Sequence, residues 1–409
     1  MLTKRAVFIF LFSLLLLLGA WISQLLWIYI AFSACMGIII LSYVLSRLLM
    51  FNLEIKRNAP AKVYEDDVVD ITIQVRNKIA LFDQSIEIQD NFTPASPGLR
   101  IKIFLLNGLP KGQSEFTYQE QCYKRGHYRL GPFKVRVTEP LGLFYHQKII
   151  PVYSPLAVYP KIFPVYHVPF ILGHLAPRFG EQTTRICGNY EEFFGIREYH
   201  KEDGWRRIHW RSTARYSQLM VRHFEQSSQW KAMVVLDANM LHNLGAGKDA
   251  TFEYGVKIAA SLIEHILYKQ ASFGLIASNK ELLRIGMSKG QGHYYSLMDA
   301  LAVIEADGSL QLPELITHYQ SVIPASSSLI IITTTDAINQ GLINMLHNLQ
   351  LKKNIGIIPV IFNGASFEDH KKIDKQSNKF SSVKGILNRL SSEVYFINCR
   401  DDLKSHFMV

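Results

Sequence analysis

Cysteine is scarce in this sequence of 409 residues, and its four copies are Cys35, Cys122, Cys187 and Cys399. The copies are scattered and never form a C-x-x-C pair, so their spacing excludes a zinc knuckle, a redox pair and a disulfide framework. Charged residues are also few, at 19% of the chain, and no lysine-rich tail concentrates the formal net charge of +10. A reducing compartment is the simplest interpretation of this cysteine usage.

Common catalytic and nucleotide-binding motifs are missing as well. The sequence has no G-x-S-x-G nucleophile elbow and no H-E-x-x-H helix. The run 245–248 resembles part of a phosphate-binding loop, but that motif requires glycine and a hydroxyl residue where His242 and Asp249 stand. The fourteen histidines are dispersed, so we single out none as catalytic. These absences favour a binding protein over an enzyme.

Charge is absent from one long stretch near the start. From Ala6 to Ser46, a run of 41 residues, there is no Asp, Glu, Lys, Arg or His, and one crossing of a bilayer needs about 20. Polar and aromatic residues at 21–24 divide the run into helices expected near 6–23 and 25–46. A cleaved signal peptide is the alternative for the first part, but the uncharged run continues too far for one.

Basic residues flank only the outer ends of this uncharged run. Lys4 and Arg5 precede it and Arg47 follows it, while none lies in the expected turn. The positive-inside rule then predicts a transmembrane hairpin, residues 1–50, with both chain termini and the remaining domains in the cytoplasm.

The next region, residues 51–165, alternates with period two. Val69, Ile71, Ile73 and Val75 are separated by polar residues, which makes one face apolar and the other polar. Shorter alternations follow at 86–88, 101–103 and 133–137. Several short strands without helical runs predict a small β-sandwich.

From residue 230 to 409 the pattern changes to apolar runs that alternate with amphipathic helical stretches. This order predicts a doubly wound α/β domain, joined to the β-sandwich through a segment at 166–229. The loops at the carboxyl ends of its parallel strands are the expected ligand face. Buried strands are expected at 233–237, 272–277, 328–333 and 355–362, and helices at 252–267 and 338–349.

Two carboxylates follow apolar runs that we expect to be strands. Asp237 and Asp336 would meet at one edge of the sheet, where a carboxylate pair suits Mg²⁺. A von Willebrand factor A-type site requires D-x-S-x-S, whereas residues 237–241 read D-A-N-M-L. Because Leu241 has no ligand atom, we expect Asp237, Asn239 and Asp336 to form a degenerate site that binds Mg²⁺ weakly or not at all. The alternative is that both acids cap the helices that follow.

Basic and aromatic residues are densest between 197 and 215. Such a mixture suits nucleic acid, because arginines track phosphates and aromatic rings stack on bases. Acidic residues such as Glu202 and Asp203 lie in the same stretch, and arginines paired with carboxylates and stacked on indoles make a structural network equally well. We favour the structural interpretation, with Trp210 buried and Arg206 paired to a carboxylate such as Asp203.

This stretch resembles the signature of the bacterial domain of unknown function 58 family, whose consensus is R-x-Y-x-P-G-D-x-x-R-x-I-x-W-x-x-S-A-R. The Pro-Gly pair is replaced by Lys-Glu at 201–202, and Thr213 stands at the serine position. Two shorter signatures match at 125–132 and 140–144. The residues that match the main signature in register are Arg197, Tyr199, Asp203, Arg206, Ile208, Trp210, Ala214 and Arg215.

The resemblance implies a membrane-anchored protein with a von Willebrand factor A-like domain, of a kind typically encoded beside MoxR-type AAA+ ATPases and thought to assist the assembly of other proteins. We therefore expect a non-enzymatic adaptor or assembly factor in the bacterial inner membrane. Its expected partners are the lipid bilayer and a MoxR-type AAA+ ATPase, and no cofactor is certain. The alternative is a membrane-associated protein that binds nucleic acid through residues 197–215.

Overall fold

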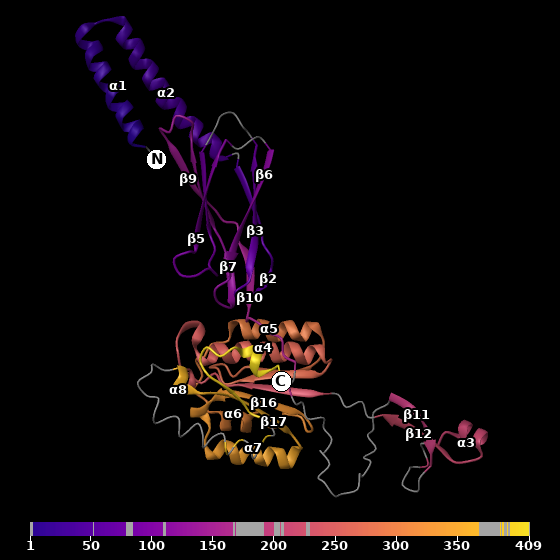
Figure 1. Ribbon diagram of the computed structural model, residues 1–409. Coiled ribbons are helices and arrows are strands. Elements are labelled where there is room, and N and C mark those ends of the chain that lie inside the picture. The colour runs from indigo at the N-terminus through magenta and orange to yellow at the C-terminus, as the bar shows by residue number, and fades with distance from the viewer. Residues whose placement is uncertain are drawn as a thin grey trace. The chain divides into compact units, whose positions relative to one another are not determined.

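The computed structural model divides the chain into two compact units (Figure 1), the first formed by residues 1–162 with 298–304 and the second by residues 163–297 with 305–409. The residues that it describes are 3–51, 53–78, 85–108, 112–166, 168, 192–199, 205, 208–225, 230–367, 385, 387, 391 and 393–408.

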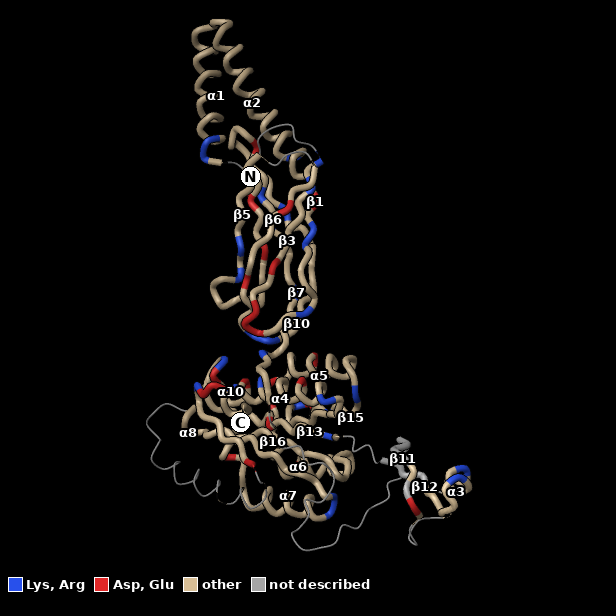
Figure 2. The backbone as a smooth tube through the Cα atoms, turned by 45° about the vertical axis from the view of Figure 1, so that its right-hand side comes forward, with Lys and Arg blue, Asp and Glu red and all other residues tan. Residues whose placement is uncertain are grey.

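Two apolar helices open the first unit, α1 (Lys4–Ser23) and α2 (Leu26–Phe51), and both are long and apolar enough to cross a membrane. Thr3 begins α1, because its hydroxyl accepts a hydrogen bond from the amide of Ala6 at 3.3 Å. Gln24 ends it in the left-handed region at φ 51°. The two helices expected from the uncharged run are confirmed, and Figure 2 shows basic residues at the start of α1. The second helix extends past Arg47 to Phe51, since arginine is a good helix former.

The rest of the first unit is almost entirely β-structure, and the predicted strands at 69–75, 86–88, 101–103 and 133–137 are confirmed. Its sheets have the strand orders β1-β3-β6, β5-β4-β8-β9 and β2-β10-β7. The strands are β1 (Leu53–Asn58), β2 (Lys62–Tyr64), β3 (Val68–Asn77), β4 (Ser85–Asn91), β5 (Ile101–Asn107), β6 (Gly112–Gln121), β7 (Gly126–Leu130), β8 (Phe133–Thr138), β9 (Tyr145–Ile150) and β10 (Ser154–Tyr159).

The period-two pattern explains how two of these sheets share a core. Ile73 and Val75 on β3 are fully buried and belong to the same apolar cluster as Ile88 on β4 and Val135 on β8. Because alternate side chains of a strand point to opposite faces, each sheet contributes one apolar face to this cluster. The last turn of α2 joins it through Leu49.

The second unit contains a six-stranded sheet in the order β15-β14-β13-β16-β17-β18, in which all neighbouring pairs are parallel except β14 with β15. The predicted alternation of strands and helices is confirmed. The elements are β13 (Lys231–Leu236), α4 (Thr251–Tyr268), β14 (Ser272–Ala277), β15 (Arg284–Ser288), α5 (Gln291–Val303, of which residues 298–303 belong to the first unit), α6 (Leu312–His318), β16 (Ser328–Thr334), α7 (Gln340–Lys353), β17 (Gly356–Phe362), α8 (Gly364–Phe367), β18 (Tyr395–Ile397) and α10 (Leu403–His406).

Helices cover both faces of this sheet, with α4 on one side and α6 and α7 on the other (Figure 1). Met233 and Val235 pack with the buried leucines of α6 and α7. On the opposite face, a Cβ added to Gly255 of α4 would lie 3.1 Å from Leu236, so this helix approaches the sheet closely. Burial on both faces explains why the strands are continuous apolar runs.

Candidate functional site

Asp237 lies directly after β13, at the edge where the carboxyl ends of the parallel strands meet. Its amide donates a hydrogen bond to the carbonyl of Ile332 at 3.0 Å, which continues the pairing of β13 with β16 by one residue. Although it follows a strand end, its side chain is only 2% exposed. A buried carboxylate requires partners to offset its lost hydration, and its surroundings supply them.

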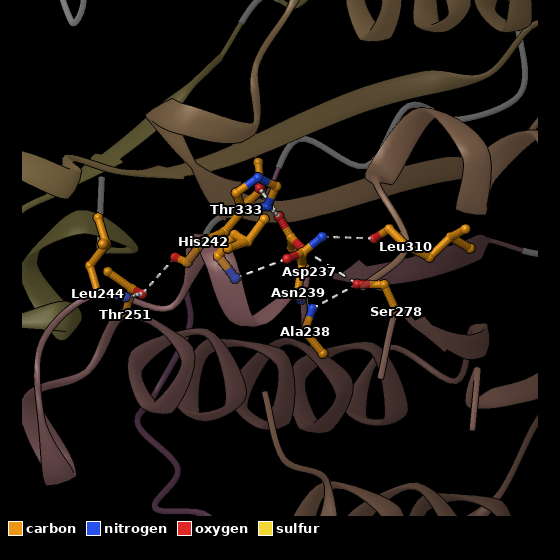
Figure 3. A network of polar contacts seen from close by, with 10 residues as sticks. Asp237, Ala238, Asn239, His242, Leu244, Thr251, Ser278, Leu310 and Thr333 are labelled. Atoms are coloured by element: carbon orange, nitrogen blue, oxygen red, sulfur yellow. Dashed lines mark hydrogen bonds and ion pairs between the residues drawn. The ribbon is translucent and has the colours of Figure 1, made fainter. Parts of the chain in front are cut away.

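Four donors surround the Asp237 carboxylate (Figure 3). Its Oδ2 accepts from the Thr333 hydroxyl at 2.6 Å and contacts His242 Nδ1 at 2.7 Å. Its Oδ1 accepts from the backbone N–H of Asn239 at 3.1 Å and from the Ser278 hydroxyl at 3.3 Å. The turn after β13, Ser278 directly after β14 and Thr333 near the end of β16 therefore meet at a single acid group, as the doubly wound topology predicts for this edge.

The same network fixes the turn that follows the acid. Asn239 is 1% exposed, and its Oδ1 accepts from the amide of Leu241 at 2.9 Å while its Nδ2 donates to the carbonyl of Leu310 at 3.2 Å. His242 lies on the short helix η2 (Met240–His242), and its Nδ1 contacts the Asp237 carboxylate. The turn is thus held at both ends by buried polar contacts.

Two apolar side chains project from this fixed turn. Met240 is 59% exposed and Leu241 is 74% exposed. Their placement is a consequence of the network, because Asn239 and His242 on either side of them bond inward. The edge of the sheet therefore presents an apolar turn at the position where a von Willebrand factor A-type site would have a hydroxyl ligand.

Two of the three predicted metal ligands, Asp237 and Asn239, share the network. Asp336 lies on the short helix η4 (Thr335–Ala337), where its Oδ2 would be 3.1 Å from a Cβ added to Gly364. Asp237 is already surrounded by N–H and O–H donors, and the Asn239 oxygen caps its own turn. Mg²⁺ requires free oxygen lone pairs in an octahedral arrangement, so this donor set does not fit it. No cluster of three or more His, Cys, Asp or Glu residues suited to a metal occurs within the described residues.

A small cavity adjoins the acid, with room for about one water molecule. Asp237, His242 and Phe252 line it together with Thr333 and Thr334. The Thr334 hydroxyl is buried there without a hydrogen-bond partner among the described residues. A water in this cavity would give that hydroxyl its partner.

The family-signature segment forms a two-stranded antiparallel ribbon with a short helix: β11 (Glu192–Glu198), α3 (Trp210–Tyr216) and β12 (Met220–Glu225). Arg197 is on β11, Tyr199 follows it, and Ala214 and Arg215 are on α3. Ile208 is 5% exposed and pairs with Val221. Asp203 and Arg206 lie outside the described residues, and so does their predicted ion pair.

The predicted burial of Trp210 is wrong. Trp210 is 65% exposed and Trp205 is 71% exposed. Trp210 is the first residue of α3, a helix in which no residue is buried. Two strands and seven helical residues offer too little apolar surface to enclose an indole ring. Sequence spacing placed the aromatic and basic residues together but did not indicate whether they face a core.

Sequence reasoning also missed His242, Ser278 and Thr333 as partners of Asp237. The sequence indicated His242 only as the residue that breaks the phosphate-loop motif. The signal that was available is positional, since Ser278 directly follows β14 and Thr333 is near the end of β16, at the edge where Asp237 follows β13. Polar residues at the carboxyl ends of adjacent parallel strands are the ones that meet.

The fold and site define an α/β protein with a mostly parallel sheet, joined in one chain to a β-rich unit that carries two long apolar helices. Residues 195–358 match the family model described as "Protein of unknown function DUF58". This match confirms, over these residues, the family resemblance that the signature residues indicated.

One relative is the "Uncharacterized protein YeaD" of Bacillus subtilis (strain 168), which is 23% identical over 199 residues, covering 49% of this chain and 48% of that protein. The match thus spans about half the length of each. Among solved structures, the CARDB domain of the PF1109 protein from Pyrococcus furiosus covers 27% of this chain and 94% of its own, at 15% identity and a TM-score of 0.20. Proximal thread matrix protein 1 from the mussel byssus covers 43% and 46%, at 10% identity and a TM-score of 0.29.

Proposed function

We propose that this protein is a non-enzymatic, membrane-anchored adaptor or assembly factor that binds protein partners through its α/β unit. The observation that carries the proposal is the turn after Asp237, where exposed Met240 and Leu241 are presented by a buried polar network. Apolar side chains on a preorganised turn lose little conformational entropy when a protein partner covers them. A small-molecule enzyme would instead need a roomier pocket than the single-water cavity beside Asp237.

The proposal assigns a von Willebrand factor A-like fold to the second unit and a β-sandwich to the strands of the first. The strand order, with one antiparallel edge strand on a parallel sheet, supports the first assignment. The apolar cluster shared by β3, β4 and β8 supports the second. In this view the acid after β13 keeps the place of a metal ligand while protein donors occupy its oxygens.

A MoxR-type AAA+ ATPase is the partner that we propose, and direct binding tests it. The full chain, held in lipid nanodiscs, would be titrated with the purified ATPase and compared with Leu241→Lys. The matched control is Leu351→Lys on α7, because Leu351 is 69% exposed. We expect binding about tenfold weaker for Leu241→Lys only, the cost of removing one good contact. Equal affinities for parent, variant and control, or no binding at all, would contradict the proposal.

The two apolar helices are proposed to form a transmembrane hairpin in the bacterial inner membrane, with the rest of the chain in the cytoplasm. Basic residues at both outer ends and none in the turn support this orientation. Reporters active only in the cytoplasm or only in the periplasm would be fused after the last residue. Activity of the cytoplasmic reporter alone is expected, and activity of the periplasmic reporter alone would reverse the topology.

A second candidate function is nucleic-acid binding by the signature segment, favoured by the exposure of Trp205 and Trp210 beside Arg211 and Arg215. Stacking on exposed rings and phosphate contacts would give an affinity that falls with salt, at a log–log slope of about −0.7 per contact for single strands. A gel-shift titration at several salt concentrations, repeated with Trp210→Ala, tests it. Salt-sensitive binding lost in the variant would favour this function over the adaptor.

A further inference from the structure

The turn between β8 and β9 is unusually well organised, and the proposed function makes no use of it. Glu139 is 2% exposed, and its carboxylate accepts hydrogen bonds from the amides of Leu141 at 2.6 Å, of Leu143, and of Phe144 at 3.1 Å. Gly142 adopts the left-handed region at φ 67°, which glycine tolerates without strain. The short sequence signature at 140–144 thus encodes a fixed turn.

This turn binds the start of the first apolar helix. The backbone amide of Thr3 donates to the carbonyl of Leu143 at 3.0 Å. The Thr3 hydroxyl contacts the carbonyls of Gly142 at 2.8 Å and Leu143 at 2.9 Å. The Arg5 guanidinium also lies over the turn, because a Cβ added to Gly142 would be 3.4 Å from Arg5 Nη1. The turn therefore lies at the level where α1 begins.

Apolar contacts extend from the turn into the uncharged run itself. Leu143 and Phe144 form a buried cluster with Ala6, and Ile9 and Ile39 pack against it. Ile9 lies three residues after the first residue of the uncharged run, and Ile39 lies seven residues before its last. At 1.5 Å per residue these positions are ~5 and ~10 Å from the ends of the run, measured along the helices. If the uncharged run lies in hydrocarbon, Leu143 and Phe144 of the turn lie at the same depth as Ile9 and Ile39, which they contact.

The groups around the turn are those found where a protein meets lipid headgroups. The Phe144 ring packs edge-on against Tyr43 at 5.6 Å, and the Arg47 guanidinium lies over the Tyr43 ring at 5.3 Å. Aromatic rings with an apolar and a polar end, and arginines that reach outward, are characteristic of this layer. Leu141, at the tip of the turn, is 55% exposed.

We propose that residues 141–144 are a membrane-interface element that inserts Leu141 among the lipids and ties the β-rich unit to the bilayer surface. This inference rests on the proposed transmembrane hairpin and goes beyond it, because the hairpin by itself assigns no lipid contact to the β-rich unit. The partner is the lipid surface.

Depth measurement by spin labelling tests the proposal. Leu141→Cys and Leu99→Cys would carry a nitroxide in the full chain, reconstituted in vesicles of phosphatidylcholine and phosphatidylglycerol. Leu99 is the matched control, because it is 59% exposed and lies near the opposite end of β4 from the turn. Leu99 precedes Ile101, which pairs with Asn91 at the last residue of β4. The turn follows Thr138, which pairs with Ser85 at the first residue of β4.

The native cysteines need only partial replacement. Serine would replace Cys35, Cys187 and Cys399. Cys122 stays in place, because it is 0% exposed and burial raises the pKa of its thiol to about 12, which keeps it unreactive.

The label at 141 is expected to collide about tenfold less often with a water-soluble nickel chelate than the label at 99, because a polar chelate enters lipid poorly. It should also collide more often with oxygen. Equal nickel accessibility at the two sites, in protein that resists extraction with carbonate, would overturn the interface element and leave the hairpin standing. Release of the protein by carbonate would overturn the hairpin and the interface element together.

Discussion

Replacing Asp237 by asparagine is the most direct test of the network beneath the exposed turn. The amide keeps the size of the carboxylate but exchanges one acceptor oxygen for an NH2 donor. In the parent, Oδ2 meets Thr333 and His242 and Oδ1 meets Asn239 and Ser278. Whichever way the amide is turned, its NH2 group meets two groups that served as donors to the carboxylate.

The size of the effect follows from burial. The side chain at 237 is 2% exposed, and Ser278 and Thr333 are 0% and 3% exposed, so bulk solvent does not reach them to replace the lost acceptor. Removing one member of a buried charged network costs about 3–5 kcal/mol. His242→Ala should cost less, about 2 kcal/mol, because its side chain is 17% exposed and three donors to the acid remain. The double variant should cost little more than Asp237→Asn alone, which measures the coupling of the pair.

Native-state hydrogen exchange in the full chain measures these costs where they arise. A loss of 3 kcal/mol or more should speed the exchange of β13 and β16 amides by about a hundredfold or more, since each 1.4 kcal/mol is a factor of ten. Amides of β3, in the other unit, are an internal reference. Asp402→Asn is the matched control, because Asp402 is an exposed helix cap where asparagine serves equally well. Exchange within twofold of the parent in Asp237→Asn would refute the reasoning.

Further predictions concern single positions. Gly308→Ala should lower the urea midpoint of the α/β unit by an amount equivalent to about 3 kcal/mol, because its Cβ would lie 1.5 Å from the carbonyl oxygen of Ser278; an unchanged midpoint would show that the loop adapts. Burial raises the pKa of Glu264, so the folded chain loses stability as pH rises through that pKa, and Glu264→Gln should be more stable than the parent at about pH 7 but not at about pH 4. Equal midpoints at both pH values would contradict this assignment. Trp210→Ala should change stability by no more than about 0.5 kcal/mol in the same urea titration, because the ring is 65% exposed. Calorimetric titration of the full chain with Mg²⁺ should give no saturable binding at micromolar concentration, and binding removed by Asp237→Ala would refute the mismatch argued from the donor set.

Much of the fold could be predicted because periodicity is a local property. The uncharged run predicted α1 and α2, the alternation at 69–75 predicted β3, and the apolar runs predicted a parallel sheet. Each pattern reports which face of a helix or strand meets apolar surroundings, and neighbouring residues alone determine that. The same patterns correctly placed Asp237 at the carboxyl edge of the sheet, directly after its first strand.

The sequence by itself therefore determined the elements, their order and the family resemblance, while the tertiary structure decided which side chains meet. Asp237 receives donors from Ser278 and Thr333, which are 41 and 96 residues away, and Thr3 binds a turn 140 residues away. The tertiary structure likewise decided that Trp210 is exposed, because no other segment among the described residues covers its ring. Such contacts depend on how strands align and how loops close on each other, and no periodicity records that alignment, because it is set by packing between segments distant in the chain.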